Sequence, residues 1–136
     1  MKLLLEKLRP FGFNVRRLHE SDLLEICDRG GITVRFDTTP RAFYLGGVIT
    51  IPARYRGLRR EFAIAHELTH HLYHVCGASP KVIYFEGIDK KSKEEIEADA
   101  MATIALMPDP AQALDNSRFA REVKRERDRL RFLYQL

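Results

Sequence analysis

Residues 60–74 read REFAIAHELTHHLYH, and they hold four of the five histidines in a chain of 136 residues. No glycine or proline interrupts the chain between residues 58 and 73. The apolar residues recur at helical spacing, with Phe62, Ala65 and Leu68 on one face. This pattern is typical of an amphipathic helix that packs against the body of a domain. We therefore predict a helix over 58–73 that carries the histidine cluster.

His66, Glu67 and His70 form the pattern HExxH within this helix. Residues four apart on a helix are offset by about 40° and about 6 Å, so the two imidazoles can converge on one metal ion. Glu67 lies about 100° further round the helix, where its carboxylate can reach a metal-bound water without taking a coordination position. The pattern predicts a zinc site with Glu67 as general base, and the alternative is a solvated polar helix face.

A catalytic zinc ion takes three protein ligands and keeps one position for water, so a third ligand is required. His74 lies one turn beyond His70, but three ligands on successive turns of a straight helix cannot all meet one ion. Cys76 stands where the pattern HExxHxxGxxH has its third histidine, yet Tyr73 occupies the place of the glycine that turns the chain there. Both are weak candidates compared with the acidic segment that follows residue 92.

Two registers of the helix predicted over 92–108 offer a carboxylate. Glu95 with Asp99 spells ExxxD, the arrangement of thermolysin-like enzymes, in which the aspartate buttresses a ligand histidine. However, Glu95 also forms a capping box with Ser92, which occupies its side chain at the helix start. Glu97 has apolar residues three, four and seven positions on, so its carboxylate faces the core, where a lone charge is costly unless paired or metal-bound. We therefore predict Glu97 as the third ligand.

Runs of β-branched and aromatic residues predict a small sheet. They lie at 32–36, 42–45 and 48–52, and Gly46-Gly47 between the last two is a two-residue hairpin signal. We expect these three strands to form an antiparallel sheet. The segment 81–87 is a further short strand candidate.

The other segments predict helices, so the fold class is α+β. One short helix is expected before Pro10, and another begins at an N-cap on Ser21 and ends at Gly30-Gly31. A last, basic helix is expected over about 117–136. With no repeats and no low-complexity linker, we expect residues 1–136 to form one domain.

Composition restricts the class of protein. Hydrophobic residues make up 45% and charged residues 31%, which suits a globular domain rather than a disordered chain. No apolar run approaches the ~20 residues that a bilayer span requires, and charged residues interrupt the leucines of the first segment before they could form a signal peptide. Cys27 and Cys76 make no disulfide framework. We therefore expect a cytoplasmic protein without a membrane partner.

The chain's net charge of +4 is concentrated near its end, because seven basic and three acidic residues lie between Arg118 and Arg131. Phe119, Val123 and Leu130 share one apolar stripe of the predicted helix, so we expect it to pack on the body or on a partner. Its arginine-rich side alternates with acids, which is typical of a solvated face. We therefore expect no nucleic-acid partner.

The two motifs together resemble the ImmA/IrrE metallopeptidases of bacteria and their mobile elements over about residues 20–110. The signature helix of that family looks like rFtlAHELGHxxlH, against REFAIAHELTHHLYH here. Its second signature resembles ExEANxFAAxLLMP, against EIEADAMATIALMP at 95–108. Aligned on the closing Met-Pro, the family's ligand glutamate falls on Glu97. Thr69 stands where the family has a glycine, and its branched side chain would narrow the site.

The resemblance implies a zinc-dependent metalloendopeptidase of the gluzincin type with a zincin-like fold. His66, His70 and Glu97 would hold the ion and Glu67 would act as base, although a His₂Glu set also suits Mn²⁺ and other divalent ions. Several members cut a separate helix-turn-helix repressor or antitoxin, so a regulator of that kind is the expected substrate.

Three further side chains are candidates for stabilising the oxyanion beyond the metal, namely His71, His74 and Tyr84. Tyr84 lies in the strand predicted at 81–87, which as an edge strand can add a substrate peptide by β-pairing. The alternative function is a metal-bound module that sequesters a regulator without cutting it. Glu67 argues against that alternative, because a structural metal site needs no general base.

Overall fold

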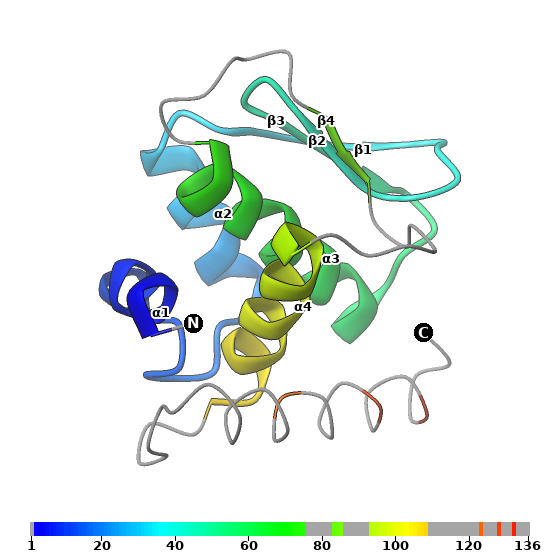
Figure 1. Cartoon of the computed structure of the whole chain (residues 1–136). Helices are drawn as coiled ribbons and strands as arrows, with labels where there is room; N and C mark the ends of the chain where they lie inside the picture. Colours follow the sequence, from blue (N-terminus) through cyan, green and yellow to red (C-terminus); the bar gives the residue numbers. More distant parts are fainter. Residues whose placement is uncertain are drawn as a thin grey trace.

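The computed structural model describes residues 2–75, 83–85 and 93–108, together with Val123, Asp128 and Phe132. These residues form an α+β arrangement in which a sheet lies over one side of a group of helices (Figure 1). The predicted α+β class is confirmed.

The helical segments follow the predicted order, and one of them changes its character partway. They are α1 (Lys2–Leu8), the 3-10 turn η1 (Arg9–Phe11), α2 (Glu20–Arg29), α3 (Gly57–Thr69), the π-helical segment η2 (His70–Val75) and α4 (Lys93–Leu106). The helix predicted over 58–73 is therefore an α-helix followed directly by a wider π turn. Within the described residues, α3 packs against α4, α2 and the sheet, which makes it the central element.

The start of α2 differs slightly from the predicted cap at Ser21. The N-cap is His19, two residues earlier, and its backbone N–H donates to the Asp22 carboxylate at 2.9 Å. The same end is tied to α3, because the Glu61 carboxylate accepts from Arg17 at 2.8 Å and from the backbone N–H of Glu20 at 2.7 Å. These bonds fix α2 against the first turns of α3.

Within the described residues the sheet has four strands, and the prediction of a three-stranded antiparallel sheet is wrong. The strands are β1 (Thr33–Asp37), β2 (Phe43–Leu45), β3 (Val48–Pro52) and β4 (Ile83–Phe85), in the spatial order β1-β3-β2-β4. The β2–β3 hairpin turns at Gly46-Gly47, both with positive φ, as predicted. However, β1 skips its neighbour in sequence and pairs with β3, and these two strands run parallel. The sheet is therefore mixed.

The connection between β1 and β2 passes the end of β3, and Arg54 holds it there. The Arg54 guanidinium donates to the carbonyls of Thr39 and Pro40 at 2.6 and 2.5 Å. In addition, the Ala53 N–H donates to the Asp37 carbonyl at 2.8 Å. These contacts are consistent with the pairing of β1 along the edge of β3 that faces away from β2. The pattern of residues within each strand does not reveal this pairing.

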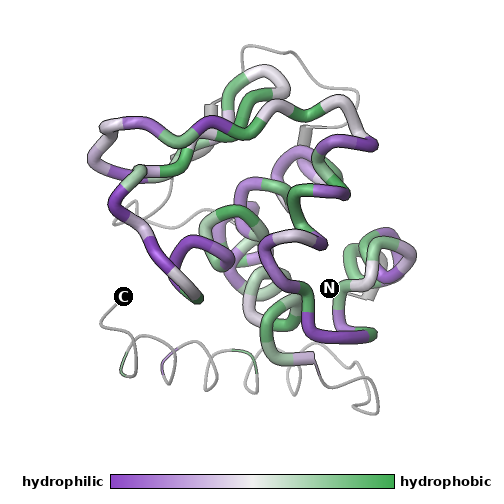
Figure 2. Tube along the Cα trace, turned by 180° about the vertical axis from the view of Figure 1, so that it is seen from behind, coloured by the Kyte–Doolittle hydropathy of each residue, from purple (hydrophilic) through white to green (hydrophobic). Residues whose placement is uncertain are grey.

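The hydrophobic core lies between the sheet and the helices. Ile49 and Ile51 of β3 are fully buried together with Ile64 and Leu68 of α3. The face of α4 that joins this core is rich in alanine, and small side chains let two helices approach closely. Hydrophobic residues recur along each helix rather than filling a whole helix (Figure 2), as expected for helices with one buried face.

In the basic C-terminal segment only Val123, Asp128 and Phe132 belong to the described residues. Val123 is buried in the core cluster, as the predicted apolar stripe requires, whereas Asp128 is exposed. The other members of that stripe and the predicted helix bounds lie outside the described residues. Among the helices that the structure describes, none is long and apolar enough to cross a bilayer.

Ile51 offers a test of this core. We expect Ile51→Ala to lower the free energy of unfolding by about 2–5 kcal/mol, because the central strand β3 would lose a fully buried side chain and leave a cavity. Chemical denaturation measures the change, and Leu45→Ala on β2, where the side chain is 38% exposed, serves as control. Equal losses in the two variants would contradict the assignment of β3 as the buried centre of the sheet.

Candidate metal site

Two imidazoles and one carboxylate converge where α4 packs on α3. The Nε2 atoms of His66 and His70 lie 3.2 Å apart. The two oxygens of Glu95 lie 2.9 Å from these nitrogens, Oε2 at His66 and Oε1 at His70. All three residues are buried, and one donor atom from each lies within 4.8 Å of the others. The helical offset of HExxH and the first turns of α4 thus place three donor atoms around one point.

The chemistry and spacing of these donors fit a zinc ion. Imidazole nitrogen and carboxylate oxygen are ligands that zinc takes at about 2.0–2.2 Å. Tetrahedral coordination at that distance separates neighbouring donors by roughly 3.3 Å, which is close to the 3.2 Å between the two Nε2 atoms. The cluster can therefore hold a divalent metal ion without rearrangement of its helices.

Burial and hydrogen bonding set the charge state of the cluster. Burial would raise the pKa of Glu95, but its hydrogen bonds with His66 and His70 lower that pKa to about 2. Burial would lower the pKa of His66, yet its hydrogen bonds with Asp99 and Glu95 raise it well above the usual value. For His70 burial prevails, and the pKa falls to about 4. At neutral pH the cluster therefore offers an ionised carboxylate and a neutral His70.

The structure brings Glu95 rather than Glu97 to the two histidines, whereas the sequence pattern favoured Glu97. Both carboxylates are buried, at 4% and 8% exposed, so the burial argument could not separate them. Glu97 lies two positions further along α4, and its Oε1 contacts His74 Nε2 at 3.2 Å. The ExxxD register, rejected because of a capping role for Glu95, is the one that faces α3. Ser92, the other half of that capping box, lies outside the described residues.

Asp99 contacts the ring nitrogen of His66 that points away from the cluster. Its Oδ1 lies 3.0 Å from His66 Nδ1, and both side chains are buried. A carboxylate only accepts, so His66 Nδ1 carries a proton and donates it to Asp99. If a metal ion replaced the proton that Nε2 shares with Glu95, the Nε2 lone pair would be directed at the cluster. In the ExxxD register, Glu95 thus supplies a donor atom to the cluster, and Asp99, one turn later, orients the His66 ring.

Glu67 lies beside the donor atoms and not among them. Its Oε1 is 3.9 Å from His66 Nε2, and its side chain is fully buried. A carboxylate at this place is within reach of a water molecule or substrate group held at the cluster. The position agrees with the role of general base that HExxH predicts.

Thr69 is buried, and its hydroxyl is engaged within α3. Its Oγ1 donates to the carbonyl of Ala65, one turn earlier, at 2.9 Å. The side chain is therefore held along its own helix. This geometry does not support the expectation that Thr69 narrows the site.

His71 and Tyr84, two of the candidates for stabilising the oxyanion, lie in different parts of the structure. His71 Nδ1 hydrogen-bonds the Tyr44 hydroxyl at 2.7 Å, and that oxygen also accepts from the Gly47 N–H at 2.9 Å. His71 thus links the π turn to the β2–β3 hairpin. Sequence reasoning missed Tyr44, because nothing local to β2 indicates a partner 27 residues away. Tyr84 pairs with Tyr44 across β4 and β2, but its side chain lies outside the described residues.

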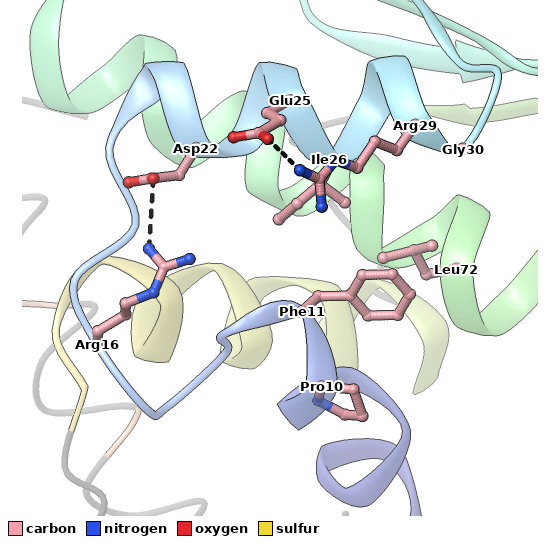
Figure 3. A pocket seen from close by; sticks show the side chains of 9 residues that line it. All are labelled: Pro10, Phe11, Arg16, Asp22, Glu25, Ile26, Arg29, Gly30 and Leu72. Atoms are coloured by element: carbon pink, nitrogen blue, oxygen red, sulfur yellow. Dashed lines mark hydrogen bonds and ion pairs between the residues drawn. The ribbon is translucent and has the colours of Figure 1, made fainter.

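A separate pocket of about 550 Å³ opens between η1 and α2 (Figure 3). Phe11 and Leu72 face one another across it, and ion pairs at its rim join Arg16 to Asp22 and Arg29 to Glu25. None of its lining residues belongs to the histidine cluster. The pocket is therefore distinct from the candidate metal site.

Comparison with known families adds an independent finding. The family model described as IrrE N-terminal-like domain, Peptidase_M78, matches residues 26–131 of the chain. This confirms the resemblance drawn from the two motifs and extends it into the basic C-terminal segment. Comparisons with curated proteins and with solved structures gave no match.

Thr69→Gly tests whether this residue obstructs the site. We expect unchanged affinity for added Zn²⁺ and a free energy of unfolding lower by about 1 kcal/mol, because glycine is a poor helix former and a buried side chain is lost. Isothermal titration calorimetry and chemical denaturation measure the two quantities. A clear gain in zinc affinity would contradict this view of Thr69.

Proposed function

Since the chain belongs to the ImmA/IrrE family of metallopeptidases, we propose that it is a cytoplasmic, zinc-dependent endopeptidase of the gluzincin type with a zincin-like fold. Its proposed substrate is a helix-turn-helix repressor or antitoxin supplied as a separate chain. The observation that carries this proposal is the convergence of His66, His70 and Glu95 beside the buried carboxylate of Glu67. We propose these three residues as the metal ligands, with Glu95 in the place first predicted for Glu97.

A zinc ion held there would supply Lewis-acid chemistry, which polarises a peptide carbonyl and makes water more acidic. The chain's own residues supply the proton transfers. Glu67 accepts a proton from the attacking water and returns it to the nitrogen of the leaving amine as the peptide bond breaks. His66, held by Asp99 at 3.0 Å, keeps its orientation during these steps.

The sheet offers a place for an extended substrate. In the strand order β1-β3-β2-β4, the strand β4 is the outer one and pairs with β2 on one side only among the described strands. A peptide in extended conformation can therefore pair with the free edge of β4. Tyr84 lies in this strand, and we propose that its place beside the substrate backbone makes it a candidate for contacts with the reacting carbonyl.

Glu67→Gln separates metal binding from catalysis. We expect the variant to keep one bound Zn²⁺ per chain and to lose at least about 100-fold in cleavage rate, because a positioned general base contributes about 10²–10⁴-fold. The rate is measured by mass spectrometry on a helix-turn-helix regulator encoded by a neighbouring gene, with metal content as control. Stable binding of that regulator by the wild-type protein without cleavage would instead favour a sequestering module.

Glu95→Gln tests the third ligand. We expect its affinity for Zn²⁺ to fall by more than about 100-fold, since the amide no longer offers an anionic donor. Loss of a residue that only orients a ligand reduces metal affinity by about 10–100-fold, so a larger loss indicates a ligand. Glu94→Gln, one position earlier on α4, is the matched control and should bind zinc like the wild type. A larger loss in Glu97→Gln than in Glu95→Gln would restore the ligand predicted from the sequence.

A further inference from the structure

A chain of three polar side chains runs away from the metal cluster and joins η2 to α4. His70 Nδ1 lies 2.9 Å from His74 Nδ1, and His74 Nε2 lies 3.2 Å from Glu97 Oε1. The side chains are nearly inaccessible, with 0% exposure for His70, 6% for His74 and 11% for Glu97. HExxH assigns no role to His74 or Glu97, so their pairing calls for another explanation.

The hydrogen-bonding capacity of these groups limits where the protons can lie. An ionised carboxylate only accepts, so His74 Nε2 carries a proton and donates it to Glu97. In the neutral imidazole of His74 the other nitrogen, Nδ1, is then an acceptor. The contact between the two Nδ1 atoms therefore requires His70 Nδ1 to be the donor. His70 Nε2 also lies 2.9 Å from Glu95 Oε1, and a carboxylate only accepts, so in the metal-free protein Glu95 and His74 compete for the single proton of a neutral His70. If Nε2 bound a metal ion, the proton would reside on Nδ1, and His74 Nδ1 would accept it.

We propose that His74 and Glu97 are positioning residues that hold His70 in the tautomer and orientation needed to bind the metal through Nε2. The inference rests on the proposed metal site. It assigns a function to the two residues that sequence reasoning had considered as a ligand and as an oxyanion stabiliser. Neither touches the metal or the substrate, since both act through His70.

The comparison with His66 supports this assignment. Asp99 contacts His66 Nδ1 directly at 3.0 Å, so each ligand histidine has a carboxylate behind it. For His66 the carboxylate acts directly, and for His70 it acts through the imidazole of His74. Both carboxylates come from α4, so the helix that supplies the third ligand also orients the other two.

The π-helical turn explains how His74 reaches His70. The segment η2 begins at His70 itself, and its wider turn alters the offset of about 40° that separates residues four apart in an α-helix. The two imidazole rings consequently lie with centroids 5.0 Å apart. π turns inside α-helices are frequent at functional sites, and here the turn brings His74 against His70.

The decisive experiment uses His74→Phe, which keeps a ring of similar size and removes the acceptor. We expect its dissociation constant for Zn²⁺ to rise by about 10–100-fold, the usual effect of removing a group that orients a ligand. His74→Gln, whose amide can accept from His70 and donate to Glu97, should recover most of this loss. His71→Phe is the matched control, because His71 contacts Tyr44 instead, and it should bind zinc like the wild type.

A second readout needs neither zinc nor catalysis. In the metal-free wild-type protein, ¹⁵N chemical shifts of the His74 ring should show a protonated Nε2, donated to Glu97, and an unprotonated Nδ1. Glu97→Met should lose this preference and bind zinc more weakly, which provides a second variant if His74→Phe does not fold. Wild-type zinc affinity in His74→Phe, or an unprotonated Nε2 on His74 in the wild type, would overturn the proposal. Failure of the wild type to bind zinc, with the tautomer as expected, would refute the proposed function alone.

Discussion

The contact between α3 and α4 is the interaction on which the site depends. HExxH places two imidazoles and a carboxylate on one helix, but the third donor and both supporting carboxylates come from the other. The alanines of α4 allow this approach because they add little bulk between the two helices. A larger residue at Ala98 or Ala102, both fully buried, would separate the helices and thereby disperse the donors. The alanines of α4 thus influence both the packing of α4 on α3 and the positions of the donor atoms.

The close approach of α3 and α4 buries several carboxylates, which is electrostatically unfavourable. Contacts with the histidines of the cluster offset this cost. Four buried carboxylates, those of Glu67, Glu95, Glu97 and Asp99, lie near this contact. Buried charges are unfavourable unless they are paired and hydrogen-bonded. Each of them contacts a histidine, at 2.9–3.2 Å for Glu95, Asp99 and Glu97 and at 3.9 Å for Glu67. The four carboxylates outnumber the three imidazoles that they contact, and this balance suits a divalent cation.

Features of the fold and the site that depend on residues close in sequence could be predicted. Features that depend on how distant segments pack together could not. The spacing of His66 and His70 and the Gly46-Gly47 turn are local, so the sequence indicates them directly. The pairing of β1 with β3 depends on a crossing held by Arg54, which no strand pattern encodes. The choice between Glu95 and Glu97 depends on how α4 is rotated about its own axis, and both positions are buried.

The argument that excluded His74 as a ligand assumed a regular helix, and its conclusion agrees with the structure for a different reason. The helix is not regular at this point, because it becomes π-helical at His70. The altered turn does not carry His74 to the metal cluster, but to the opposite nitrogen of His70. An imidazole there offers an acceptor to His70 and a donor to Glu97 at the same time, which neither a carboxylate nor an ammonium group can do. In the proposed site the histidine-rich sequence therefore meets two needs, since His66 and His70 would provide donors for a metal and His74 would determine which nitrogen His70 presents.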